Sequence, residues 1–181
     1  MEIFTIGHST HTADEFIKLL TDANIDFLVD VRSFPGSRKF PHFHKDQMKV
    51  WLPEAGIDYA HNLKLGGRRN MSKTVDKNVN NGWTNKSFHN YADYTLEVEF
   101  QEGLDELKKK ASTATVAYCC AERHPARCHR LLISNWLSLN GWNVQHILDG
   151  PKGTTLIETH EPGKWGASPI LRADNTVVYP E

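Results

Sequence analysis

Short apolar runs alternate with amphipathic stretches over residues 1–149, and this alternation limits the folds that the chain can adopt. Near-continuous apolar runs bounded by turn residues are typical of strands buried on both faces of a sheet. We expect such strands at residues 2–6, 27–31, 57–60, 115–119 and 143–147, with helices between them at 12–23, 48–55, 88–107 and 129–140. Strands that alternate with helices form a parallel sheet covered on both faces. The sequence therefore predicts an α/β fold, a three-layer Rossmann-like sandwich with about five mostly parallel strands.

Two polar segments interrupt or follow this pattern. Residues 62–87 are rich in Asn, Lys and Gly, and such a long stretch inside a compact domain is usually functional or mobile. Residues 150–181 are also polar and contain several Gly and Pro residues. We expect residues 1–149 to form the α/β core domain and residues 150–181 to be a C-terminal extension packed on the core or on a partner.

Charge and cysteine content restrict the class of protein. The formal net charge is −1, so any anion binding must come from locally clustered arginines and not from bulk charge. The three cysteines cannot all pair, and neither a secretory signal nor a membrane span is recognisable. We expect a cytoplasmic protein with reduced thiols, no membrane association and no cofactor. Whether it forms a homodimer stays open.

Reactive side chains concentrate in residues 120–130, Cys-Ala-Glu-Arg-His-Pro-Ala-Arg-Cys-His-Arg. This segment lies between an expected strand and an expected helix. A loop that leads into a helix offers free backbone N–H groups, which can bind an anion or lower the pKa of a thiol. The segment therefore indicates where the functional site lies.

Polar clusters follow three of the expected strands. Residues 7–10 follow the first strand, residues 30–32 end the second, and residues 120–122 follow the fourth. Ligands of open α/β sheets bind at the carboxyl ends of the strands. We therefore expect these three clusters to meet at one edge of the sheet.

Candidate roles follow from the chemistry of each side chain. Glu122 and His8 could act as general acid or base, Asp30 could orient an arginine or a sugar, and Cys128 could be a nucleophile. The candidate substrate- or anion-binding residues are Ser9, Arg32, Arg38, Arg127, His129 and Arg130. Arg130 leads this group because a guanidinium can bind a phosphate or carboxylate with two hydrogen bonds.

Each candidate also has a structural interpretation. His8 and Ser9 could cap a helix, Asp30 and Arg32 could form a structural ion pair, and Glu122 could form a salt bridge with Arg130. Cys128 is flanked by basic residues that lower a thiol pKa, yet the segment lacks the Cys-x5-Arg spacing of thiol phosphatases. Cys128 could therefore be a nucleophile or only shape the loop.

Neither metal binding nor base stacking is strongly indicated by the remaining motifs. Paired CxxC or HExxH spacing is absent, so we predict no metal site. A basic and aromatic set could stack a base or hold single-stranded nucleic acid, or could be solvated loops whose aromatic side chains cover the edge of the core. This set comprises Arg32, Arg38, Arg68, Arg69, Phe40, Phe43 and Trp83.

Together, the motifs resemble the bacterial and archaeal family called domain of unknown function 488. They are Gly7-His8-Ser9-Thr10, Asp30-Val31-Arg32 with Pro35 and Ser37-Arg38, Leu65-Gly66-Gly67, Cys120-Ala121-Glu122 and Cys128-His129-Arg130. The resemblance covers residues 3–148 and implies an α/β fold with a shared polar site. Genomic arguments link that family to nucleic-acid or nucleotide metabolism.

These observations lead to two functional hypotheses. We expect an enzyme, a hydrolase or transferase, that acts on a phosphate-bearing small molecule or nucleic acid at the carboxyl edge of the sheet. The alternative is a non-catalytic nucleotide- or nucleic-acid-binding module, in which the same arginines bind and nothing reacts.

Overall fold

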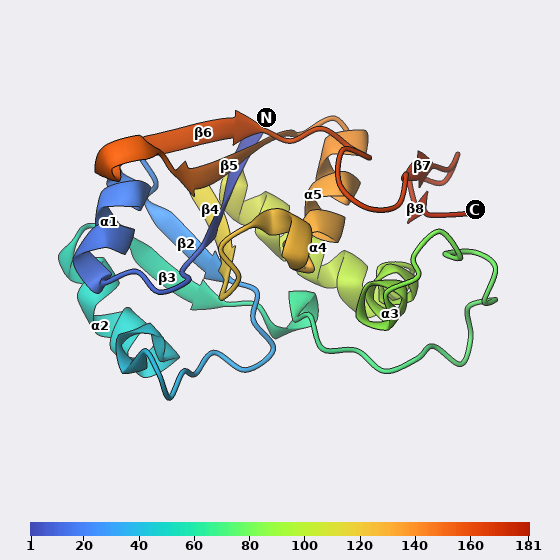
Figure 1. Cartoon of the computed structure of the whole chain (residues 1–181), viewed down its shortest axis with the longest axis horizontal. Coiled ribbons are helices and arrows are strands. Elements are labelled where there is room, and N and C mark those ends of the chain that lie inside the picture. Colours follow the sequence, from blue (N-terminus) through green and yellow to red (C-terminus); the bar gives the residue numbers. More distant parts are fainter.

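The computed structural model describes residues 1–181 and contains a six-stranded sheet in the order β3-β2-β4-β1-β5-β6 (Figure 1). Five strands are parallel: β1 (Glu2–Gly7), β2 (Phe27–Asp30), β3 (Asp58–His61), β4 (Val116–Cys120) and β5 (Asn143–Asp149). The sixth, β6 (Thr155–Thr159), pairs antiparallel with β5. The predicted α/β fold with a mostly parallel sheet is confirmed, and β6 is the strand that the apolar pattern did not predict.

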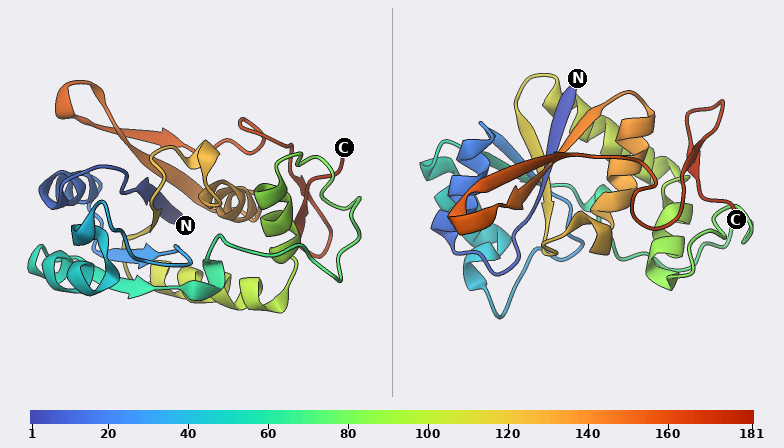
Figure 2. Two further views of the ribbon diagram at one scale, coloured as in Figure 1. Left: turned by 60° about the horizontal axis from the view of Figure 1, so that its bottom comes forward. Right: turned by 45° about the horizontal axis from the view of Figure 1, so that its top comes forward.

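Helices cover both faces of this sheet (Figure 2). α1 (Ala13–Asp22) and α2 (Lys45–Glu54) pack on one face through a cluster that includes Phe16, Leu20 and Met48. α4 (Val98–Ala111) and α5 (Arg130–Leu139) pack on the other, with α3 (Lys86–Tyr94) at the end of that layer. Short 3-10 helices lie at Pro41–Phe43, Leu63–Leu65, Pro125–Arg127 and Pro151–Gly153.

The start of α1 shows how local sequence sets a boundary. The Thr12 hydroxyl accepts the N–H of Glu15 at 3.1 Å, and the Glu15 carboxylate accepts the N–H of Thr12 at 2.8 Å. This reciprocal pair satisfies two N–H groups that a helix N-terminus otherwise leaves free. The capping box predicted from these two residues is therefore confirmed.

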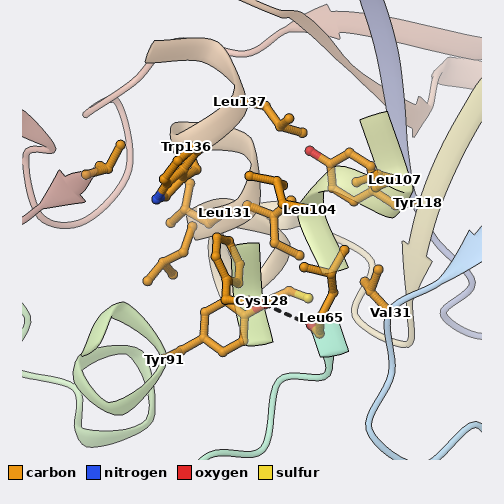
Figure 3. Close-up of a cluster of buried hydrophobic side chains, with 14 of the residues drawn as sticks. Val31, Leu65, Tyr91, Leu104, Leu107, Tyr118, Cys128, Leu131, Trp136 and Leu137 are labelled. Atoms are coloured by element: carbon orange, nitrogen blue, oxygen red, sulfur yellow. Dashed lines mark hydrogen bonds between the residues drawn. The ribbon is translucent and has the colours of Figure 1, made fainter. Parts of the chain in front are cut away.

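The face covered by α4 and α5 holds the larger core cluster, shown in Figure 3. Leu104 and Leu107 of α4 meet Leu131 and Trp136 of α5 in this layer. Burial of each large apolar side chain contributes about 1.5–3 kcal/mol. The N-terminus of α5 is thereby fixed against the sheet, at the edge where β4 ends.

The C-terminal segment packs against the same layer. Its strands β7 (Ile170–Leu171) and β8 (Val177–Val178) form a separate antiparallel pair. Tyr179 is buried, and its hydroxyl accepts a hydrogen bond from Nδ2 of Asn135 in α5 at 3.1 Å. Nowhere in the structure does a helix have the length and apolar character needed to span a membrane.

Candidate functional site

The carboxyl ends of β1, β2 and β4 and the N-terminus of α5 surround a cleft of about 740 Å³. Its position at this edge follows from the parallel order of the strands. Of the predicted site residues, those that line the cleft are His8, Arg32, Glu122, Arg127, Cys128 and His129. Ser9, Asp30, Arg38 and Arg130 do not line it.

Gly7 allows the loops at this edge to approach one another. A Cβ atom at this position would lie 1.8 Å from the carbonyl oxygen of Glu122. Beyond the strands, the N–H of His8 donates to the Cys120 carbonyl and that of Ser9 to the Ala121 carbonyl, both at 2.9 Å. The close contact places the Cys120–Glu122 segment directly against the end of β1.

Asp30 and Arg32 form a buried ion pair at the end of β2. Oδ2 of Asp30 accepts from Nη2 of Arg32 at 2.6 Å and from the Tyr59 hydroxyl at 2.5 Å. Nη2 also donates to the Phe43 carbonyl at 2.8 Å. Burial alone would lower the pKa of Arg32, but the hydrogen bond and charge of Asp30 raise it. Arg32 is therefore a fixed positive charge beneath the cleft.

His8 connects this pair to the cleft. Its Nδ1 lies 3.0 Å from the Ser9 carbonyl, which can only accept a hydrogen bond, so we assign the proton to Nδ1. Nε2 then accepts from Nη1 of Arg32 at 3.2 Å. Burial first, and Arg32 second, lower the pKa of His8 to about 4. The imidazole is neutral at pH 7, and both of its nitrogens already have partners.

Arg130 is buried at the start of α5, and its guanidinium holds the preceding loop together. Nη1 donates to Oγ1 of Thr5 at 2.9 Å, Nη2 to the Glu122 carbonyl at 2.7 Å, and Nε to Sγ of Cys120 at 3.1 Å. The salt bridge considered between Glu122 and Arg130 is not formed, because the contact is to the backbone carbonyl. The Glu122 carboxylate is exposed at the cleft and has no hydrogen bond or ion pair.

Cys128 belongs to the larger core cluster (Figure 3), also lines the cleft, and is 5% exposed. Its sulfur accepts the backbone N–H of Arg130 at 3.4 Å. Burial by itself raises the pKa of this thiol, but a hydrogen bond from Cys120 and the charge and N–H of Arg130 together lower it to about 7. Burial raises the pKa of both Cys119 and Cys120. Cys128 is therefore the thiol that ionises near neutral pH.

His129 lies beside this thiol, with its orientation fixed from two sides. Nε2 donates to the Val31 carbonyl at 2.8 Å, and Nδ1 lies 3.5 Å from Sγ of Cys128. A Cβ atom at Gly67 would lie 2.5 Å from Nδ1, so the Gly66-Gly67 turn packs directly on the ring. Burial is the main cause of the lowered pKa of His129. With Nε2 protonated, Nδ1 is the nitrogen that can accept a proton from the thiol.

The remaining predicted residues lie around this centre. Arg127 is exposed on the cleft and its side chain has no hydrogen-bond or ion-pair partner. Arg38 is exposed outside the cleft lining. The Ser9 hydroxyl accepts Nε of Arg123 at 3.2 Å, and Ser9 adopts a left-handed backbone with φ of 47°.

The cleft also contains residues for which the sequence predicted no role in the site. These are Ser33, Phe34, Gly36 and Ser37 after β2 and Asn85, Ser87 and Phe88 at the start of α3. Arg68 also lines the cleft; it was considered only as part of a basic and aromatic surface. Of the two interpretations of that surface, burial of Phe43 and Trp83 in the core favours aromatics that cover the core edge over aromatics that stack a base. The composition of a polar loop does not show which of its side chains turn towards a cleft.

No group of three or more His, Cys, Asp or Glu side chains is placed to hold a metal ion. A family model described as "Domain of unknown function DUF488" matches residues 12–137 of the 181-residue chain. No curated protein and no solved structure matches the chain.

Proposed function

Since this chain belongs to the DUF488 family of unknown function, we propose its activity from the site itself. We infer that it is an enzyme that acts on a phosphate-bearing substrate, a nucleotide or a nucleic acid, with Cys128 as nucleophile. The observation that carries this proposal is the position of the Cys128 thiol at the N-terminus of α5, where it accepts the Arg130 N–H and faces the cleft. A thiol needs partial ionisation near neutral pH to act as a nucleophile.

Positive charge and free donors beside this thiol favour an anionic substrate. Arg127 and Arg68 line the cleft with unpaired guanidiniums. The backbone N–H of His129, at the start of α5, donates to no atom of the protein. Helix N-termini bind phosphates through such free N–H groups. Arg32 and Arg130 already donate hydrogen bonds to acceptors within the protein. In this proposal they therefore add fixed positive charge near the phosphate but do not bind it directly.

The proposed reaction uses one nucleophile and one acid. Ionised Cys128 attacks the electrophilic centre of the substrate and forms a covalent bond as the leaving group departs. The leaving group takes a proton from Glu122, which enters this step as the neutral carboxyl group and whose side chain is free at the cleft. Water or an acceptor alcohol then gives a proton back to Glu122 and displaces the thiolate, which makes the enzyme a hydrolase or a transferase.

Two variants test whether the cleft catalyses a reaction. We expect the full chain to convert at least one member of a panel of nucleoside phosphates and short single-stranded oligonucleotides, with products separated by chromatography. Glu122→Gln and Cys128→Ser should each lower turnover by at least about 100-fold. Both should still bind the substrate found, measured by calorimetry. Turnover that survives both changes would refute the assigned roles, and binding without turnover in the wild type would support a binding module.

The anion contacts are tested by a matched pair of arginines. Arg127→Gln removes a guanidinium that lines the cleft, whereas Arg38→Gln removes one that is also exposed but lies outside the lining. We expect Arg127→Gln to weaken binding of inorganic phosphate about 5- to 20-fold, as loss of a charge-assisted hydrogen bond would. Arg38→Gln should leave the affinity unchanged, and equal effects of the two would contradict the proposed position of the anion.

A further inference from the structure

The cleft has an aromatic wall that a phosphate group alone does not need. Phe34, in the loop after β2, lines the cleft with 70% of its side chain exposed. No other aromatic side chain is among the exposed large hydrophobic residues. Full burial of a phenyl ring would stabilise the fold by about 1.5–3 kcal/mol, and an exposed ring does not provide this stabilisation. The fold therefore gains little burial free energy from this ring, which makes a ligand contact its simplest role.

Arg68 lies against the same ring. Its guanidinium carbon is 5.2 Å from the centroid of Phe34, and its side chain has no hydrogen bond or ion pair. Cation–π contact orients a guanidinium on an aromatic face. Since most of the ring is still exposed, Phe34 keeps surface available for a second flat group.

The loops that carry these two residues are held together by the backbone. The N–H of Arg68 donates to Oγ of Ser33 at 2.9 Å. A Cβ atom at Gly66 would lie 2.6 Å from the same oxygen, so the two loops are in direct contact. The positions of Phe34 and Arg68 are thus coupled before any ligand arrives.

The size and the polar lining of the cleft also suit a larger ligand than phosphate. About 740 Å³ falls in the range of pockets that enclose whole small molecules. Asn85 and Ser87, which also line the cleft, are exposed and polar, and the Ser87 hydroxyl has no partner in the protein. A flat heterocycle stacked on Phe34 would find hydrogen-bonding groups there.

We propose that Phe34 and Arg68 form a nucleobase-binding subsite in the cleft that contains Cys128. The base stacks on the Phe34 ring while its phosphate lies near the N-terminus of α5. This inference rests on the proposed function, and it narrows the substrates to base-bearing phosphates, which excludes base-free phosphate esters.

Binding of three small probes to the full-length protein tests the subsite. The probes are adenosine 5′-monophosphate, ribose 5-phosphate and inorganic phosphate, each titrated by calorimetry. Stacking on an aromatic side chain contributes about 1–3 kcal/mol per base. We therefore expect the adenosine nucleotide to bind about 5- to 100-fold more tightly than ribose 5-phosphate.

Substitutions at Phe34 separate the base contact from the phosphate contact. Phe34→Ala should abolish the advantage of the nucleotide and leave ribose 5-phosphate unchanged, while Phe34→Trp should preserve the advantage. Ile170→Ala, at a residue 51% exposed on β7 and away from the cleft, is the matched control and should change nothing. A nucleotide that binds no more tightly than ribose 5-phosphate would refute the subsite alone. Failure of all three probes to bind would refute the phosphate-bearing substrate as well.

Discussion

At the scale of single residues, the polar side chains around the cleft fall into two groups. Each side-chain nitrogen of His8, Arg32 and Arg130 has a hydrogen-bonding partner within the protein. Glu122 and Arg127 reach the cleft with free polar groups. The first group fixes charge and loop geometry, and the second is available to a ligand. In the proposed function, the anion would therefore contact the second group and not the first.

The thiol of Cys128 should ionise below the usual range for cysteine. Its pKa is lowered to about 7 by Cys120 and Arg130, against a usual value of about 8.5. We expect the rate of iodoacetamide labelling at Cys128 to reach half its maximum near pH 7, with mass spectrometry to locate the label. Cys119 and Cys120 should stay unlabelled in the folded protein, because burial raises the pKa of both thiols.

A variant at Cys120 shows whether that lowered pKa depends on the neighbouring thiol. Cys120→Ala removes the hydrogen bond that helps to lower the pKa of Cys128, so the labelling midpoint should move to higher pH. Cys128→Ser should abolish labelling and is the control for the assignment. A wild-type midpoint at 8.5 or above would exclude Cys128 as a nucleophile at neutral pH.

Gly7 should tolerate no side chain. The 1.8 Å approach to the Glu122 carbonyl means that Gly7→Ala must push the Cys120–Glu122 segment away from β1. We expect the free energy of unfolding, measured in urea, to fall by about 3 kcal/mol. Gly36→Ala is the control: its Cβ would meet only the His44 ring, at 3.3 Å, and should cost less than about 0.5 kcal/mol. Similar losses for the two variants would contradict the close contact.

The sequence predicted where the site lies better than it predicted which side chains are free. Convergence at one sheet edge follows from strand order, so His8, Arg32 and Glu122 do line one cleft. Whether Arg130 faces a ligand or its own loop depends on Thr5 and the Glu122 carbonyl. Those contacts arise only when β1, β4 and α5 pack together, and no local pattern encodes them.

At the scale of elements, strong periodicity produced the correct predictions. β2 and β4 are apolar runs that are almost entirely buried, and α1 carries its capping box. β6 was not predicted because most of its residues are exposed, including Leu156 and Ile157. An exposed strand at a sheet edge lacks the apolar signature of a central one. Its pairing with β5 is decided by tertiary contact.

α5 links the cleft to the C-terminal segment. Arg130 and Cys128 lie at its N-terminal end, and Asn135 in its middle contacts Tyr179. Loss of the Tyr179 hydroxyl would leave the buried Nδ2 of Asn135 without an acceptor. We expect Tyr179→Phe to lower the free energy of unfolding by about 1–3 kcal/mol in urea denaturation.

The same variant distinguishes a docking role from a role in the cleft. Because the Tyr179 ring is retained, its contact with Trp83 should survive, so the loss reports the hydrogen bond. Labelling of Cys128 should keep its pH midpoint in Tyr179→Phe. Unchanged stability would show that the hydrogen bond between Asn135 and Tyr179 does not help to hold the segment.

At the scale of the whole molecule, a buried chain of hydrogen bonds joins β1, β5, α5 and the C-terminal segment. Asn135 donates through Nδ2 to Tyr179, so its Oδ1 accepts from Nε2 of His160 at 2.9 Å. Nδ1 of His160 then accepts from Nε2 of His146 at 2.9 Å, and Nδ1 of His146 accepts from the Thr5 hydroxyl at 2.8 Å. Each imidazole donates one hydrogen bond and accepts one. The chain is therefore complete only when both histidines are neutral.

This chain predicts that the folded protein loses stability in mild acid. Burial is the main cause that lowers the pKa of His146 to about 2 and that of His160 to about 4, while both titrate near 6.5 when unfolded. Below pH 6.5 the unfolded state therefore binds more protons than the folded state, so the free energy of unfolding falls with falling pH. Each histidine contributes a slope of about 1.4 kcal/mol per pH unit to the free energy of unfolding, down to its folded pKa.

Urea denaturation at pH 7, 6 and 5 should show this decline in the free energy of unfolding. His160→Gln should reduce the slope of the decline by about 1.4 kcal/mol per pH unit. Equal stability of the wild type at pH 7 and pH 5 would mean that the two histidines are not held neutral by the fold.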